Sequence, residues 1–365
     1  MNTDQDTWAE PGRHATAPIG GTLAPGGFAC DAEQKTRPEV AFHLRQLLRS
    51  SFGDGPSSRL LPPRGHSLWL VVGLGLLAAG AGRAQELEPG AYAPSPIGFN
   101  ILVAADVFNS GDLTFDPALR ITDASARIHL GALGYVRTLG VAGRSANVGL
   151  VLPYARGHLE GIYLGQRQEL YRSGLADPRL RFAVNLCGSP AVGPKEFAAH
   201  RGRTILGASL LVSAPLGQYD PVKLINIGMN RWAFKPELGF SQALGRWTLE
   251  AAAGAWLFGD NRNFAGGKTR AQDPLGSFQG HVIYTIRPRL WVALSANCYT
   301  GGRSSIDGVP NADLQQNSRL GVTVAVPVTR QHSLKFSYSQ GAITTVGGDF
   351  NSFGIAWQYV WRSAP

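Results

Sequence analysis

The residues of this chain that could bind a solute or move a proton are charged and amide side chains spaced two positions apart. Arg179 and Arg181 are separated by one leucine, and Gln279 and His281 by one glycine. Residues two apart point to the same face of a β-strand. The spacing therefore predicts polar strand faces that surround an interior through which a solute could pass. The residues predicted to line this path are Asp106, Arg127, His129, Arg137, Arg179, Arg181, Asn185, Lys235, Glu237, Glu250, Gln279, His281, Asn297 and Lys335.

These side chains do not form a known catalytic or metal motif. A nucleophile needs a base within hydrogen-bond reach and usually a third group that orients the base. The chain has no Gly-x-Ser-x-Gly segment to accompany its histidines, and no His-Glu-x-x-His or EF-hand pattern. The glycines around Lys268 lack the spacing of a phosphate-binding loop. We expect no enzyme activity, no cofactor and no metal ion.

Composition indicates what kind of sheet positions these residues. Charged residues make up 16% of the 365 residues, below the typical figure of about 25%, and glycine is abundant at 46 residues. No run of about 20 apolar residues is present to form a membrane helix. A transmembrane β-barrel needs apolar residues only at every second position of a strand. The net charge of +9 is spread along the chain without a dense basic run, so no nucleic-acid partner is expected.

The C-terminal segment is the strongest single indication of a barrel. Phe353, Ile355, Trp357, Tyr359 and Trp361 alternate with smaller or polar residues. Trp and Tyr are enriched at the boundary between membrane and water. We expect this segment to be the last barrel strand and to pair with the first.

Eleven more alternating segments precede it, which predicts an all-β fold: a transmembrane antiparallel barrel of about 12 strands. Predicted connections alternate between long and short, as barrels require, except at the long connection 188–203. A soluble β-sandwich is the alternative architecture. The predicted strands are 97–108, 126–139, 147–154, 179–187, 204–214, 231–244, 247–258, 278–286, 290–299, 319–328, 332–340 and 353–361.

The N-terminal part differs from the rest. Residues 1–63 form an irregular extension, which a start codon assigned too far upstream would explain. Residues 64–84 have a basic residue, a short apolar run and a small-x-small site, the pattern of a signal peptide for Sec export. Residues 85–365 are predicted to be the outer-membrane barrel. Of the three cysteines, Cys187 and Cys298 could pair after export, or both could be separate small apolar residues.

Several motifs occur in an order that resembles one family. They are 92–100 (YAPSPIGFN), 174–179 (GLADPR), 215–219 (PLGQY), 226–239 (NIGMNRWAFKPELG), 258–261 (FGDN), 272–274 (QDP) and 301–302 (GG). Over residues 92–361 the chain resembles the outer-membrane transporter-like family catalogued under the meta-pathway of phenol degradation. The resemblance implies an outer-membrane barrel that passes or binds small solutes, including hydrophobic or aromatic compounds. For a barrel in the outer membrane we also expect contact with outer-membrane lipid and with the barrel assembly machinery.

Two interpretations of the predicted interior are open. A wet channel with a basic lining would favour anionic or polar solutes. Alternatively, the same side chains pair across the interior and fill it, as in small barrels. Two further functions stand as alternatives to a channel: a barrel enzyme that acts on lipid, and a plugged barrel with a structural or interaction role.

Overall fold

The computed structural model describes residues 87–115, 121–199, 204–223 and 225–362. These residues all belong to one of two compact units, Leu61–Pro365. The predicted extension and signal peptide lie outside the described residues. In the part of the chain that is described, no helix is long and apolar enough to cross a membrane.

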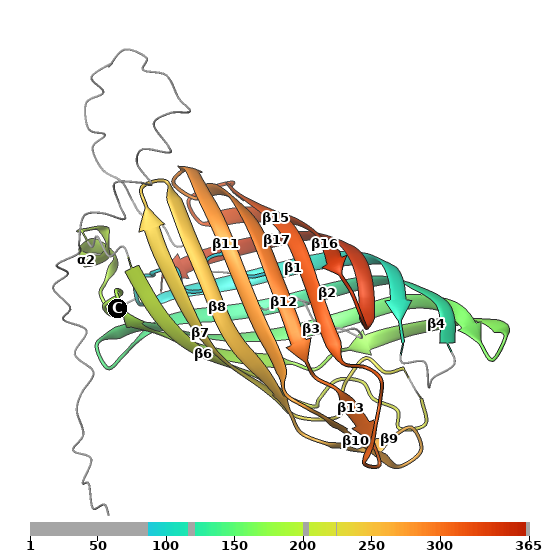
Figure 1. The fold of residues 1–365 in the computed structure, drawn as a ribbon. Coiled ribbons are helices and arrows are strands. Elements are labelled where there is room, and N and C mark those ends of the chain that lie inside the picture. Colours follow the sequence, from blue (N-terminus) through green and yellow to red (C-terminus); the bar gives the residue numbers. More distant parts are fainter. Residues whose placement is uncertain (1–86, 116–120, 200–203, 224, 363–365) are drawn as a thin grey trace, which may run out of the picture. The chain divides into compact units, whose positions relative to one another are not determined.

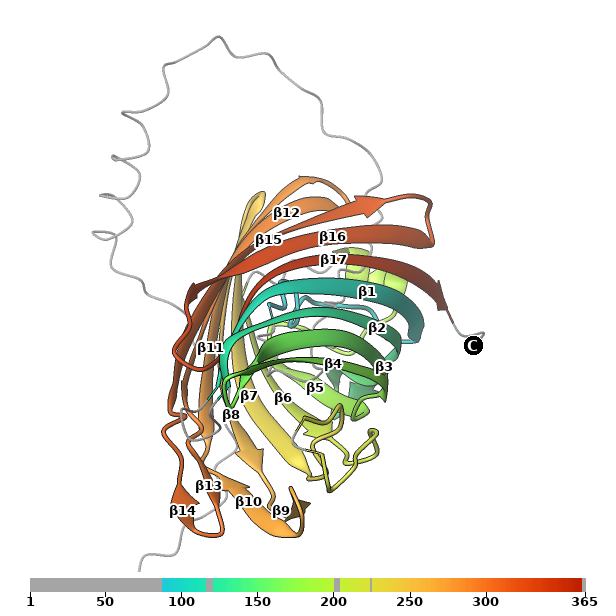
Figure 2. The same ribbon diagram turned by 90° about the vertical axis from the view of Figure 1, so that its right-hand side faces the viewer.

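Twelve antiparallel strands close into a barrel, as predicted (Figures 1 and 2). Closure is made by β1 and β17, which pair from Phe99 opposite Arg362 to Thr114 opposite Gly347. The barrel strands are β1 (Phe99–Thr114), β2 (Ile121–Val141), β3 (Arg144–Tyr163), β5 (Arg179–Cys187), β6 (Thr204–Ser213), β7 (Ala233–Leu244), β8 (Trp247–Phe258), β11 (Leu275–Arg287), β12 (Leu290–Gly301), β15 (Gln315–Pro327), β16 (His332–Ile343) and β17 (Gly347–Arg362).

The fourth barrel position is shared by two strands. β5 pairs with the first half of β3, and β4 (Gln166–Leu175) pairs with the second half. The connection predicted at 155–178 is therefore mostly strand. β3 continues to Tyr163, and a tight turn at Leu164 and Gly165, both with positive φ, leads into β4. Leu164 adopts a conformation that favours glycine, which hides this turn from sequence patterns.

Connections at the two ends of the barrel differ in length, which identifies the ends. Two to four residues join β2 to β3, β7 to β8, β11 to β12 and β15 to β16. The connection between β5 and β6, which contains the short helix α2 (Pro194–Ala199), also lies at this end. Short connections are typical of the periplasmic end of bacterial barrels. The opposite end, where the connections 214–232, 259–274 and 302–314 lie, is called the outer end below.

A small sheet forms at the outer end from parts of two connections. It contains β9 (Asn261–Phe264), β10 (Lys268–Gln272), β13 (Ser304–Ile306) and β14 (Val309–Pro310), in the order β14-β13-β10-β9. β10 and β13 pair although they come from different connections. Figure 1 shows these strands gathered beyond the ends of the barrel strands.

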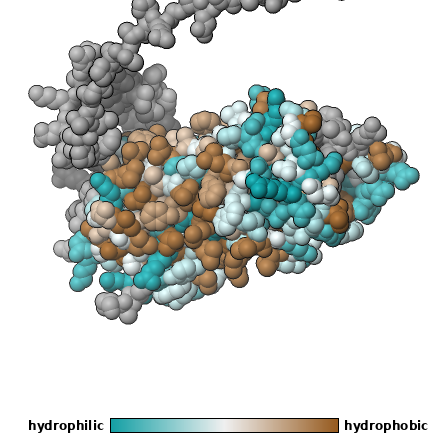
Figure 3. Space-filling view, turned by 90° about the horizontal axis from the view of Figure 1, so that it is seen from below, coloured by the Kyte–Doolittle hydropathy of each residue, from teal (hydrophilic) through white to brown (hydrophobic). Residues whose placement is uncertain are grey.

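Apolar side chains face outward over much of the barrel. Phe353 and Ile355 of β17 are exposed, as predicted, and Trp357, Tyr359 and Trp361 stack in succession along the same strand. Figure 3 shows apolar residues gathered over one part of the surface and hydrophilic residues over another. Cys298 is free and exposed on β12, so it does not pair with Cys187.

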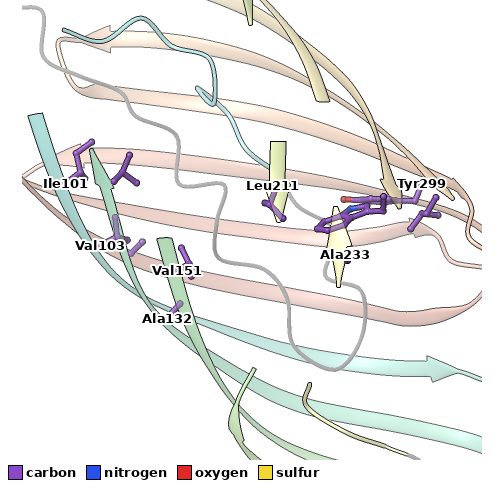
Figure 4. Packing of buried hydrophobic residues seen from close by; sticks show 11 residues of the cluster. Ile101, Val103, Ala132, Val151, Leu211, Ala233 and Tyr299 are labelled. Atoms are coloured by element: carbon purple, nitrogen blue, oxygen red, sulfur yellow. The ribbon is translucent and has the colours of Figure 1, made fainter. Parts of the chain in front are cut away.

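The inward face of the first strands is apolar as well. Ile101 and Val103 of β1, Ala132 of β2 and Val151 of β3 are buried together in one cluster, labelled in Figure 4. The outward neighbour Leu102 is 37% exposed, whereas Ile101 is 1% exposed. The lumen therefore has an apolar wall made by β1, β2 and β3.

Candidate functional site in the barrel lumen

Residues 87–98, just before β1, contact residues that point into the lumen. Glu88, Tyr92 and Ser95 of this segment are buried, although none lies in a strand. The segment is anchored near its end, where the hydroxyl of Thr138 donates to the carbonyl of Pro96 at 2.8 Å. Prolines at 89, 94 and 96 limit the backbone freedom of the segment.

Tyr92 makes the most extensive contacts of this segment. Its hydroxyl donates to Oε1 of Glu237 at 2.9 Å and lies 3.0 Å from Oγ of Ser209. Ser209 and Glu237 are directly opposite each other on β6 and β7. A buried Tyr hydroxyl usually needs such partners. The phenol therefore bridges two neighbouring strands of the wall.

The ring of Tyr92 lies over two glycines, Gly207 and Gly239, which are also opposite each other on β6 and β7. A Cβ atom on Gly239 would lie 2.0 Å from the ring, and one on Gly207 would lie 2.3 Å from it. Only glycine lets the ring approach the backbone this closely. These glycines form a shallow seat for the ring, and we refer to them as the glycine seat.

Two further contacts hold the segment. The backbone N–H of Gly90 donates to Oε2 of Glu250 at 2.6 Å. The guanidinium of Arg181 lies 5.4 Å from the centroid of the Tyr92 ring, within cation–π range. Each of these two contacts involves a lumen side chain, and neither is part of a strand ladder. At the end of the segment, Ile97 and Gly98 donate backbone hydrogen bonds to Val192 and Thr138.

Beyond the apolar wall, β5 to β16 present charged and polar side chains to the lumen, together with apolar ones such as Leu211 and Trp256. Nζ of Lys235 lies 2.9 Å from Oε2 of Glu237, and both side chains are buried. Nε2 of Gln279 donates to the same carboxylate oxygen at 3.2 Å. Glu237 thus joins the segment, through Tyr92, to the charged wall.

Basic and aromatic side chains alternate toward the outer end of this wall. Arg179 and Lys235 lie 5.6 Å and 5.9 Å from the centroid of the Trp256 ring. Arg231 lies 4.6 Å from the Phe258 ring centroid and donates a hydrogen bond to Gln272. Such contacts keep cations beside flat apolar surfaces, an arrangement suited to ligands that carry both an aromatic ring and a negative charge.

Ten of the predicted path residues lie on the lumen-facing side of their strands. Each alternates along its strand with exposed or less buried neighbours, as the twofold spacing predicts. They are Arg179, Arg181, Asn185, Lys235, Glu237, Glu250, Gln279, His281, Asn297 and Lys335.

The other four, Asp106, Arg127, His129 and Arg137, face outward, so their predicted orientation is wrong. They belong to β1 and β2, whose lumen face is apolar. The prediction assumed that polar side chains face inward on every strand. A difference of one residue in register moves a whole strand face to the other side, so the error affects all four together.

Several lumen residues were missed by sequence reasoning. Arg319 is buried and donates from Nη1 to Ser339 and Ser352 at 2.8 Å and 2.7 Å. It was the first residue of a predicted strand, but its face was not assigned. Glu88 and Tyr92 precede the first strand, where alternation has no meaning. A signal for Tyr92 was its place in the motif 92–100.

One Ser–His contact bears on catalysis. Nδ1 of His281 lies 2.8 Å from Oγ of Ser295, and both residues face the lumen. No hydrogen bond to Nε2 of His281 occurs within the described residues, so an orienting third group of the usual kind is missing there. The pair also points away from lipid. This geometry favours a structural hydrogen bond over a lipid-cleaving site.

At the outer end, a single carboxylate connects three segments. Asp177, between β4 and β5, accepts hydrogen bonds from the backbone N–H groups of Gly217 at 2.9 Å and Met229 at 2.8 Å. Burial raises the pKa of Asp177 above its ordinary value, although the two N–H donors oppose this shift. The connection 214–232 also reaches β9, because the amide of Asn261 donates to the hydroxyl of Tyr219 at 2.9 Å. We call this set of contacts the Asp177 clamp.

A closed twelve-stranded barrel with an apolar exterior and a partly charged lumen defines the class of outer-membrane β-barrel proteins. Residues 105–359 match the family described as "Putative MetA-pathway of phenol degradation", and the chain belongs to that family. The resemblance predicted from the motifs is thereby confirmed.

Solved structures that match this chain include two bacterial outer-membrane proteins. The COG4313 outer membrane channel from Pseudomonas putida F1 is 21% identical, with a TM-score of 0.62 over 75% of this chain and 99% of that one. The β domain of the Bordetella autotransporter BrkA is 16% identical, with a TM-score of 0.45 over 72% of this chain and 99% of that one. No curated protein matches the chain.

Proposed function

We propose that this protein is an outer-membrane channel through which small solutes pass along the lumen. The observation that carries the proposal is that residues 87–98 are held against the lumen wall by side-chain contacts around Tyr92. Contacts of this kind can break and re-form without opening the barrel, because no ladder hydrogen bonds are involved. The segment would then narrow the path when bound and widen it when released.

We further propose that the solutes include aromatic or other hydrophobic compounds, especially those with a negative charge. The apolar lumen residue Val151 of β3 is directly opposite Arg179 of β5 in the strand pairing, so the apolar and the charged parts of the lumen adjoin. A solute with both apolar and anionic parts could contact both walls at once. The description of the family, which names phenol degradation, supports the proposal of aromatic solutes.

Planar bilayer recordings test the channel. We expect the wild-type protein to give stepwise conductance, and Tyr92→Ala to spend a larger fraction of time in the most conductive state. Tyr163→Ala, at an exposed tyrosine of β3, is the matched control and should behave as wild type. A wild-type protein that is closed in every recording, with Tyr92→Ala equally closed, would favour the plugged structural barrel instead.

Uptake into liposomes tests the solute class. We expect benzoate to enter liposomes that contain the protein faster than a neutral sugar of similar size. Equal rates for both solutes would contradict the preference for aromatic anions while leaving the channel intact. Hydrolysis of the liposome lipid, if it occurred, would favour the barrel enzyme.

The route to the membrane is also a proposal. We propose export by the Sec route with cleavage after Ala84, followed by insertion by the barrel assembly machinery. N-terminal sequencing of the mature protein should begin at Gln85, and depletion of the assembly machinery should leave the protein unfolded in the periplasm. A mature chain that begins at Asn2 would contradict the first step.

A further inference from the structure

The outward face of β1 to β4 changes from apolar to polar along the strands. Strand pairing places residues in rows that cross the sheet. Three rows toward the periplasmic end carry exposed apolar or aromatic residues, including Leu133, Leu152 and Tyr154. In the next two rows toward the outer end, His129 is opposite Arg156, and Arg127 is opposite His158. The change from apolar to basic takes place between neighbouring rows.

Arg127 and Arg156 are diagonal neighbours on the outward face of β2 and β3, and both are exposed. Diagonal neighbours in an antiparallel pair have Cα atoms about 7–8 Å apart, so two long side chains can reach a common ligand. Within the described part of the chain, neither guanidinium has a hydrogen bond or an ion pair. Two adjacent cations are therefore available to an anion from outside.

Three of the acidic groups around them are already paired. Oδ1 of Asp106 lies 3.3 Å from Nδ1 of His129, and Oε2 of Glu169 lies 3.4 Å from Nε2 of His158. Glu160 pairs with Arg167 and accepts from Ser125. Each of these carboxylates has a partner other than Arg127 or Arg156. Asp112 of β1, a diagonal neighbour of Arg127, is a further exposed carboxylate, so the two arginines together retain a positive charge that can attract an added anion.

The height of the pair along the barrel indicates which anion. The apolar rows must be covered by lipid chains, and lipid phosphates lie just beyond the chains. Arg127 and Arg156 occupy the first rows beyond the apolar ones, at the outer end. A guanidinium forms paired hydrogen bonds with phosphate oxygens, which a lysine does not. Tyr154 and Tyr171, both exposed, flank the pair as boundary residues do.

We infer that Arg127 and Arg156 form a binding site for the phosphate groups of a phosphorylated glycolipid in the outer leaflet. The inference rests on the proposed location in the outer membrane, but not on passage of solutes. Bound lipid would cover the outward face of β2 and β3, next to β1, which pairs with β17 to close the barrel. It would thereby stabilise the outer ends of these strands.

The test uses the full-length mature protein in micelles, titrated with diphosphorylated lipid A and followed by native mass spectrometry. Each arginine near a lipid surface contributes about 1 kcal/mol, so Arg127→Ala with Arg156→Ala should weaken binding on the order of tenfold or more. Arg137→Ala, an exposed arginine on the same face of β2 toward the periplasmic end, is the matched control and should bind as wild type.

Three further measurements make the outcome decisive. Dephosphorylated lipid A should bind the wild type and the double variant equally. Millimolar inorganic phosphate should not displace lipid A, and displacement would mean that the site takes free phosphate. Equal lipid A binding by wild type and double variant would overturn the inference. Cell fractionation separates this result from failure of the proposed function, because a protein outside the outer membrane would contradict both.

Discussion

The backbone N–H of Met229 donates to Oδ2 of Asp177 at 2.8 Å, which joins the connection 214–232 to the junction between β4 and β5. The other carboxylate oxygen accepts from Gly217. Asp177, Gly217 and Met229 come from three separate motifs of the family pattern, 174–179, 215–219 and 226–239. The clamp gives these motifs a common structural role, because all three meet at one buried carboxylate.

Removal of this carboxylate should loosen the connection 214–232. Asp177→Ala leaves two backbone N–H groups without their acceptor, and a hydrogen bond to a charged group contributes about 1.5–3 kcal/mol. We expect trypsin to cleave at Lys223, an exposed residue of this connection, at least tenfold faster in the variant. Asp260→Ala, at an exposed carboxylate of the same end, is the control and should be cleaved as wild type. Equal cleavage of Asp177→Ala and wild type would show that other contacts hold the connection.

The pH dependence of the clamp follows from burial of the same group. Burial raises the pKa of Asp177 above its ordinary 3.8 in the folded protein. The folded state therefore binds a proton more tightly than the unfolded state, so this group's contribution to stability is full below pH 3.8 and is lost as the pH rises through the folded pKa. The melting temperature should fall less steeply with rising pH in Asp177→Asn than in wild type when both are measured between pH 3.5 and 6. An identical slope in the variant would contradict the assignment.

The glycine seat predicts the effect of a single methyl group. Gly239→Ala would place Cβ 2.0 Å from the Tyr92 ring, so the ring must leave. Loss of the two hydrogen bonds of Tyr92 corresponds to about 2 kcal/mol, or roughly thirtyfold in the ratio of released to bound segment. We expect Gly239→Ala to raise bilayer conductance as Tyr92→Ala does.

Two controls separate this effect from general damage to the barrel. Gly280→Ala should leave the bilayer conductance unchanged, because its Cβ would meet nothing nearer than 3.8 Å. Gly239→Ala should add little in a Tyr92→Ala background, since both changes act on one contact. Additive increases in the double variant would mean that the glycine acts by another route.

Charge in the lumen should set ion preference. Arg319 is a buried lumen cation whose hydrogen bonds go to neutral oxygens of Ser339, Ser352 and Phe350. Arg319→Gln removes the charge and retains donors, so we expect a lower anion-to-cation permeability ratio from reversal potentials in a salt gradient. Arg127→Gln, on the outward face, should leave the ratio unchanged. A ratio unaffected by Arg319→Gln would place the solute path elsewhere in the lumen.

The barrel itself was predictable because its signals are local. Alternation along β5, β8 and β17 is visible within about ten residues, and predicted and observed bounds agree closely at 179–187 and 247–258. The inward faces of β5 to β16 were predictable for the same reason, since charged residues alternate there with exposed apolar ones.

The rest depends on relationships that alternation does not encode. Both faces of β1 carry apolar residues, so the pattern around Ile101 and Leu102 does not say which face meets lipid. Tyr92 lies 117 positions from Ser209 and 145 from Glu237, and only the closed fold brings them together. In the Asp177 clamp the hydrogen-bond donors are backbone N–H groups. Almost every residue type has such a group, so the sequence does not reveal which ones contact Asp177.

The pairing of β1 with β17 closes the barrel and so encloses the segment 87–98 in the lumen. The two strands come from opposite ends of the barrel sequence, with Phe99 opposite Arg362, so the sheet stays open until the last strand arrives. Before β1 and β17 pair, Tyr92 can reach the glycine seat through the open edge of the sheet. After they pair, it can reach the seat only along the barrel axis. Residues 87–98 are tethered directly to β1, so the final strand pairing also encloses them. The pairing of β1 with β17 therefore does more than close the sheet, because it also encloses the segment that contacts the lumen wall.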